Sequence, residues 1–95
     1  MKVFISGKIS GIEEQAFQVF EAAEINLRAA GYEPINPMKL NHDHDKSWGS
    51  YMRVCIIALC QCDAIYMLSN WESSSGAKLE HYIAENLELK KIGKQ

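Results

Sequence analysis

One stretch in the second half of the chain combines an apolar run, a serine-rich turn and the start of a helical pattern. The run AIYML at 64–68 is nearly continuous in its apolarity, which is typical of a strand covered on both faces of a parallel sheet. WESSSGAKLE follows at 71–80, and apolar residues then recur at Leu79, Ile83 and Leu87. A strand that ends in such a turn and opens a helix points backbone N–H groups outward, where they can hold an anion. The stretch therefore predicts an α/β unit with a binding turn.

Glu80 is the residue of this stretch with the clearest chemical potential. It follows Gly76 by one helical turn, so its side chain is expected to face the mouth of the turn. Gly76 and Ala77 keep that turn narrow, which would let a ligand approach the backbone. We expect the Glu80 carboxylate to be ionised at neutral pH because the positive helix end lies nearby, and this suits a nucleophile better than a general acid. A capped helix with a solvated glutamate is the alternative interpretation.

The rest of the chain continues the alternation of strand and helix patterns. Strands are predicted at 2–6 and 32–36, helices at 13–30 and 47–61, and either a last strand or a helix extension at 89–92. Pro34 places its strand at a sheet edge, because proline cannot donate to a ladder. The alternation predicts a parallel sheet with right-handed crossovers and helices on both faces.

If the strand order is 2-1-3-4, the order reverses between the first and third strands. In such sheets ligands bind beyond the carboxyl ends of the strands at this point of reversal. The loops 7–11 and 71–76 would meet there, so a second argument selects the same turn.

Composition limits the classes of protein to be considered. The 95 residues predict a single domain, 1–95, and the net charge of −2 without a basic stripe argues against a nucleic-acid polymer as partner. No apolar run approaches the ~20 residues that a membrane helix needs. Three cysteines, an odd number with no signal peptide ahead of them, favour a reduced thiol state. We expect a soluble cytoplasmic protein that contacts no membrane.

Two groups of residues invite a metal interpretation. His42-Asp43-His44-Asp45 lacks a third spaced ligand, so a solvated loop or a substrate contact is the alternative. Cys55, Cys60 and Cys62 do not have the spacing of a zinc pair. The glycines at 7 and 11 do not make the dinucleotide fingerprint G-x-G-x-x-G. We expect no metal and no cofactor.

The helix at 47–61 also suggests an assembly. Its predicted inner face consists of Tyr51, Val54, Cys55, Ala58, Leu59 and Cys62. Ile56 and Ile57 fall outside that face, and two adjacent exposed isoleucines indicate a partner surface. We expect a homodimer or a larger even homo-oligomer that uses this helix.

Several blocks, in order along nearly the whole chain, carry a family resemblance. They are KVFISGKI at 2–9 with Gly11, Asn36-Pro37, Trp48 with YMR at 51–53, L-x-x-CDAIYML at 59–68, and W-x-x-S-x-GA-x-x-E-x-x-x-A at 71–84. The chain resembles the nucleoside 2-deoxyribosyltransferase-like family, and most closely its small uncharacterised branch common in bacteria and phages.

The resemblance implies a flavodoxin-like (Rossmann-like) three-layer sandwich and chemistry at the N-glycosidic bond of a deoxynucleoside or its 5′-monophosphate. Glu80 would attack the anomeric carbon and form a glycosyl–enzyme intermediate, as in retaining glycosidases. Ser74, two residues before Gly76 in the binding turn, would contact the 5′-phosphate. The remaining contacts would come from the loop Gly7-Lys8-Ile9, which would hold sugar or phosphate, and from Trp71, which would stack on the base.

The chain departs from the active members of that family at two positions. They carry a tyrosine where this chain has Phe4, and its hydroxyl positions the glutamate. They carry an aspartate, which helps to protonate or orient the leaving base, where this chain has Cys55. A cysteine of pKa about 8.5 is mostly a neutral thiol at pH 7 and a poor carboxylate substitute. Two interpretations follow: an enzyme with Glu80 as nucleophile, or a nucleotide-binding module with little or no turnover. In both, Phe4 and Cys55 belong to the predicted site.

Overall fold

The computed structural model describes residues 1–42 and 45–93, and its strands and helices alternate as expected. The elements are β1 (Lys2–Ser6), α1 (Glu13–Ala29), β2 (Glu33–Ile35), the 3-10 turn η1 (Pro37–Lys39), α2 (Trp48–Cys60), β3 (Ala64–Met67), the 3-10 turn η2 (Trp71–Ser73), α3 (Ser75–Asn86) and β4 (Lys90–Ile92). The last segment, for which the sequence allowed two outcomes, is a strand.

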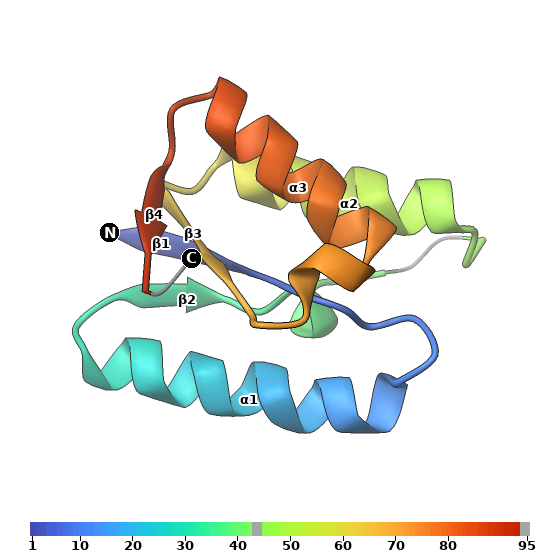
Figure 1. Cartoon of the computed structure of the whole chain (residues 1–95), viewed down its shortest axis with the longest axis horizontal. Helices are drawn as coiled ribbons and strands as arrows, with labels where there is room; N and C mark the ends of the chain where they lie inside the picture. The colour runs from blue at the N-terminus through green and yellow to red at the C-terminus, as the bar shows by residue number, and fades with distance from the viewer. Residues whose placement is uncertain (43–44, 94–95) are drawn as a thin grey trace.

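The four strands form one parallel sheet in the order β2-β1-β3-β4, which confirms the expected order. In the middle of the sheet Phe4 of β1 lies opposite Ile65 of β3 on one side and Ile35 of β2 on the other. β2, with its proline, is an edge strand. Helix α1 covers one face of the sheet, and α2 and α3 cover the other (Figure 1). The protein therefore has a flavodoxin-like, three-layer α/β fold.

The alternation of side chains along β1 divides the core into two clusters. Val3 and Ile5 pack with the inner face of α1, which consists of Ala16, Phe20, Ala23 and Leu27. Phe4 points to the opposite face and packs with residues of α2, β3 and α3. All three strand residues are fully buried. Coverage on both faces explains why the central strands are apolar at nearly every position.

The helix ends follow local sequence signals. Ser47 and Ser74 are the N-caps of α2 and α3, and their hydroxyls accept hydrogen bonds from the backbone N–H groups of Ser50 and Ala77. Gly31 follows the C-cap of α1 with φ +93°, a conformation that glycine adopts without strain. Helices α1 and α2 agree to within one residue at each end with the predicted ranges 13–30 and 47–61.

The inner face of α2 requires a correction. Met52 is buried together with Cys55 and Leu59, although the predicted face omitted it. Ile57 is 61% exposed, but Ile56 is half-buried, so the expected pair of exposed isoleucines is reduced to one. The predicted assembly therefore stays a prediction. No helix in the described part of the chain is long and apolar enough to cross a membrane.

Candidate functional site

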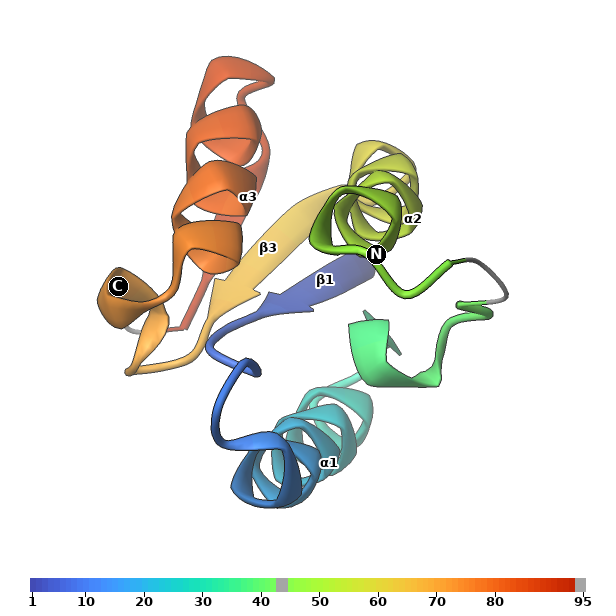
Figure 2. The same ribbon diagram turned by 90° about the vertical axis from the view of Figure 1, so that its right-hand side faces the viewer.

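A pocket of about 720 Å³ opens at the carboxyl ends of β1 and β3. Figure 2 looks onto this edge of the sheet, with the first turns of α1, α2 and α3 arranged around it. The volume lies within the range of about 300–1,000 Å³ that small-molecule sites occupy. The predicted site residues that line it are Gly7, Lys8, Ile9, Cys55, Ser74, Gly76 and Glu80. The loop after β1 and the turn after β3 thus meet at the point where the strand order reverses.

Glu80 lies deep in this pocket and is only 5% exposed. The hydroxyl of Ser6, at the end of β1, donates a hydrogen bond of 2.5 Å to Glu80 Oε1. Burial raises the pKa of the Glu80 carboxyl to about 7, and the Ser6 hydrogen bond offsets only part of that rise. At this pKa the carboxyl is only partly ionised at neutral pH, so the expectation of an ionised carboxylate holds only in part.

Cys55 and Tyr51, one turn apart on α2, form the wall next to Glu80. Burial raises the pKa of the Cys55 thiol to about 12, and the charge of Glu80 adds to the rise, so this thiol is neutral. Burial also raises the pKa of Tyr51, with further contributions from Cys55 and Glu80. Within the described residues, the Tyr51 hydroxyl is a buried polar atom without a hydrogen-bond partner of good geometry. Both groups are therefore uncharged at pH 7.

The serine turn before α3 keeps two backbone donors available. The Ser74 hydroxyl accepts from the Ala77 N–H at 3.1 Å, which uses one donor of the first turn. Within the described residues the N–H groups of Ser75 and Gly76 donate no hydrogen bond. These two groups, at the positive end of α3, can bind an anionic or polar atom.

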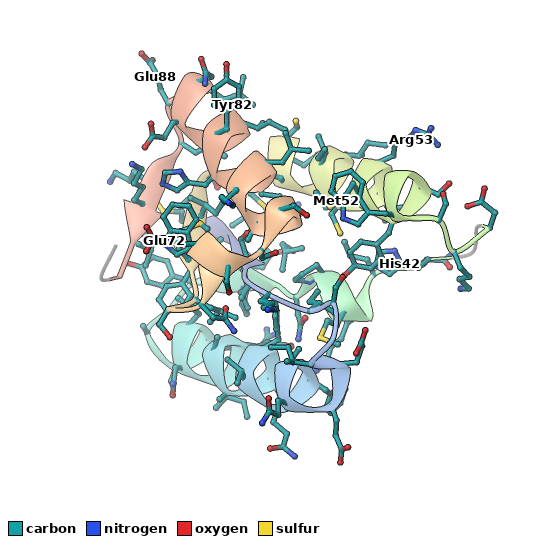
Figure 3. The ribbon with its side chains drawn as sticks, turned by 45° about the vertical axis from the view of Figure 1, so that its right-hand side comes forward. His42, Met52, Arg53, Glu72, Tyr82 and Glu88 are labelled. Atoms are coloured by element: carbon teal, nitrogen blue, oxygen red, sulfur yellow. The ribbon has the colours of Figure 1, made fainter. Side chains whose placement is uncertain are left out.

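Gly76 is held in close packing with α2. A Cβ atom added there would lie 3.2 Å from Met52 Sδ and 3.8 Å from Trp48 Nε1. In Figure 3, Met52 extends from the side of α2 that faces α3, whereas Arg53 points outward. Because Gly76 has no side chain, the starts of α2 and α3 can pack closely together. The same absence leaves the backbone at Gly76 open to a ligand.

Two contacts fix the loop after β1: Gly7 packs against Leu68, and Lys8 is hydrogen-bonded to Asn70. Gly7 is buried, and a Cβ atom there would lie 2.6 Å from Leu68 Cδ1. The Lys8 N–H donates to Asn70 Oδ1 at 3.1 Å, which joins this loop to the segment after β3. Two chain segments far apart in sequence therefore hold each other in place at the pocket.

Two predicted site residues lie elsewhere. Phe4 is fully buried in the core between the sheet and the helices α2 and α3, and it is not among the residues that line the pocket. Trp71 belongs to η2, where its ring stacks on His81 with 4.3 Å between centroids, and it too is absent from the described lining. The tryptophan on the pocket wall is Trp48, which is 52% exposed.

His42 is one of the residues that line the pocket. Its ring stacks on Tyr51 with 4.2 Å between centroids, and its Nε2 lies 2.8 Å from the Pro37 carbonyl oxygen. Asp43 and His44 lie outside the described residues. Among the residues that the structure does describe, no group of three or more His, Cys, Asp or Glu side chains could hold a metal ion.

Sequence reasoning did not assign to the site two residues of the pocket wall, Tyr51 and Trp48, or Ser6, which holds Glu80. Ser6 ends a buried strand on the same face as Phe4, and a serine at that place is a recognisable signal for a polar contact beyond the strand. Tyr51 was predicted only as part of the inner, buried face of α2. Trp48 stands one residue after the N-cap Ser47, and no local pattern indicates that it faces the pocket.

The fold and the pocket define a small flavodoxin-like α/β protein with a pocket at the point where its strand order reverses. The site combines a buried carboxyl, a serine-capped helix start and an aromatic wall. By sequence, the chain belongs to the family described as Domain of unknown function (DUF4406), whose model matches residues 1–92. A comparison with curated proteins found no match.

Proposed function

We propose that the protein cleaves, or transfers a deoxyribosyl group at, the N-glycosidic bond of a deoxynucleoside or its 5′-monophosphate. The observation that carries the proposal is the Glu80 carboxyl at the bottom of the pocket, fixed by Ser6. The resemblance to the nucleoside 2-deoxyribosyltransferase-like family supports the same chemistry. In the proposed first step the ionised Glu80 attacks the anomeric carbon, and the base leaves with the electrons of the carbon–nitrogen bond.

In the proposed second step, water or another base attacks the anomeric carbon of the glycosyl ester and releases Glu80. The raised pKa of Glu80 influences both steps. Near pH 7 about half of the carboxyls carry the negative charge needed for attack, since pH and pKa are then similar. A carboxylate that is poorly solvated is also a stronger nucleophile toward a carbon that develops positive charge.

The direct test is incubation with a panel of deoxynucleosides and their 5′-monophosphates, with and without an acceptor base, followed by chromatography of the free base. We expect base release that rises with pH through about 7, because deprotonation of Glu80 creates the nucleophile. It should vanish in Glu80→Ala. The exposed Glu72→Ala serves as the matched control and should behave as wild type. Release that persists in Glu80→Ala would exclude Glu80 as nucleophile.

The alternative function is a nucleotide-binding module of the same fold with little or no turnover. The neutral, buried Cys55 favours it, because a thiol whose pKa is raised to about 12 is a weak proton donor for a leaving base. Binding of a nucleotide without base release at any pH in the panel would select this alternative.

A phosphate on the ligand should strengthen binding. The free N–H groups of Ser75 and Gly76, with Lys8 also on the pocket wall, can contribute charge-assisted hydrogen bonds. Each is worth roughly 1.5–3 kcal/mol, so we expect a deoxynucleoside monophosphate to bind at least about tenfold more tightly than its nucleoside in calorimetric titrations. Ser74→Ala should reduce this preference, whereas Ser69→Ala, on an exposed site outside the lining, should not. Equal affinities for both ligands would remove the serine turn from a phosphate role.

A further inference from the structure

The walls of the pocket differ in chemistry along its length. One part is polar and consists of Lys8, Ser10 and the serine turn 73–75. The part formed by the start of α2 and the segment before it is aromatic, with Trp48, Tyr51 and His42. A ligand that fits both parts has one flat aromatic portion and one polar or anionic portion.

Trp48 is the most accessible of the three rings. It occupies the first position of α2 and is 52% exposed although it lines the pocket. Its indole Nε1 lies 3.8 Å from the position that a Cβ atom on Gly76 would take, so the ring reaches across to the start of α3. About half of the surface of this pocket-lining residue stays accessible.

The two other rings are already paired with each other. His42 stacks on Tyr51 with 4.2 Å between centroids and an interplanar angle of 12°. His42 approaches from the segment before α2, and Figure 3 shows it close to the end of α2 that carries Met52. In this stacked pair each ring covers one face of the other. Trp48 therefore has the free aromatic surface of the pocket, and nucleobases stack readily on such surfaces.

The geometry points to Trp48 as the residue that stacks on the base of a nucleotide bound in the pocket, with the phosphate at the serine turn. This inference rests on the proposed function and assigns to Trp48 the contact that the sequence suggested for Trp71. Trp71 stacks on His81 instead and is not among the residues that line the pocket. Since stacking strength grows with ring area, purine nucleotides should bind more tightly than pyrimidine nucleotides.

The chain contains two tryptophans, so each serves as the control for the other. The probe is a carbocyclic deoxynucleoside 5′-monophosphate, which lacks the ring oxygen and therefore resists cleavage through an oxocarbenium-like transition state. In Trp71→Phe, whose only indole is Trp48, we expect the probe to quench tryptophan fluorescence with the wild-type Kd. In Trp48→Ala, we expect loss of the quenching and affinity lower by roughly tenfold, as typical for removal of one base–aromatic stack.

The sugar phosphate without a base separates the two halves of the site. 2-Deoxyribose 5-phosphate should bind wild type and Trp48→Ala with Kd values within about twofold of each other, since it makes no base contact. Nucleotide binding that is equally tight in Trp48→Ala and wild type would overturn the assignment of Trp48 and leave the proposed function intact. If wild type binds neither the probe nor the sugar phosphate, the proposed function fails, and this inference fails with it.

Discussion

Replacing Glu80 with glutamine is expected to remove a large part of the pH dependence of stability between about pH 4.5 and 7. The folded carboxyl has a pKa raised to about 7, and its ordinary value is 4.5. Throughout this interval the folded protein holds a proton that the unfolded chain has lost. Wild-type stability therefore falls as pH rises from 4.5 to 7, and it remains at the lower level above pH 7.

The expected difference follows from the size of the pKa shift. At pH 8 Glu80→Gln should be more stable than wild type by on the order of 3 kcal/mol, whereas at pH 4 the two should be nearly equal. Glutamine has almost the same shape, and its carbonyl oxygen can still accept the Ser6 hydroxyl hydrogen bond. Urea unfolding at a series of pH values measures both quantities.

The exposed Glu72→Gln is the control for the change of side chain and should keep the wild-type slope. Lys39 is a main cause of the lowered pKa of Glu24, and Lys91 is the main cause of the lowered pKa of Glu85. The stability that these two carboxylates contribute is therefore lost mainly as pH falls below 4.5. Parallel stability curves for wild type and Glu80→Gln from pH 4.5 to 7 would show that Glu80 is well solvated in the folded protein.

The second large effect is expected from Gly7→Ala. A Cβ atom at Gly7 would lie 2.6 Å from Leu68 Cδ1 and 2.8 Å from Leu68 Cβ. The first contact could be relieved by a new rotamer, but the second could not, because Cβ moves only with the backbone of Leu68. We expect a loss of about 1–3 kcal/mol in the free energy of unfolding, as for other overpacked cores. Since Gly7 also lines the pocket, ligand affinity should fall as well.

Gly49 provides the matched control for this substitution. It lies in the first turn of α2, and a Cβ atom there would meet none of the described residues within 4 Å. Gly49→Ala should be neutral or raise stability by up to about 1 kcal/mol, because alanine is the better helix former. A Gly7→Ala variant as stable as Gly49→Ala would mean that the β1 loop shifts freely and is not fixed by Leu68.

Local patterns were sufficient to predict most of the fold. The order of strands and helices follows from two patterns that alternate along the chain. Continuous apolar runs, such as 64–68, form strands. Apolar residues that recur every three or four positions, as from Ala16 to Leu27, form the buried face of a helix. Ser47, Ser74 and Gly31 mark helix ends through hydrogen bonds and backbone angles within a few residues. The place of the pocket then follows from the strand order, because parallel strands end at one edge.

The details of the site depended on contacts between distant residues. Ser6 and Glu80 are separated by 74 positions, so their hydrogen bond could not be inferred from spacing along either segment. Which tryptophan reaches the pocket was decided by η2, a single turn that leads Trp71 toward His81. Phe4 was predicted in the site, but it lies two residues before Ser6 on the same face of β1 and is fully buried under the helices, where Cys55 packs beside it.

The sequence by itself determined the alternation of elements, the helix caps and the presence of Glu80 on the turn-facing side of α3. These features depend on hydrogen bonds and side-chain periodicity that span at most a few turns. Only the tertiary structure decided how deeply Glu80 is buried, which hydroxyl holds it, and which aromatic ring faces the pocket. The physical reason is desolvation: the pKa of a carboxyl depends on how much water all surrounding segments exclude, and helical spacing does not contain that information.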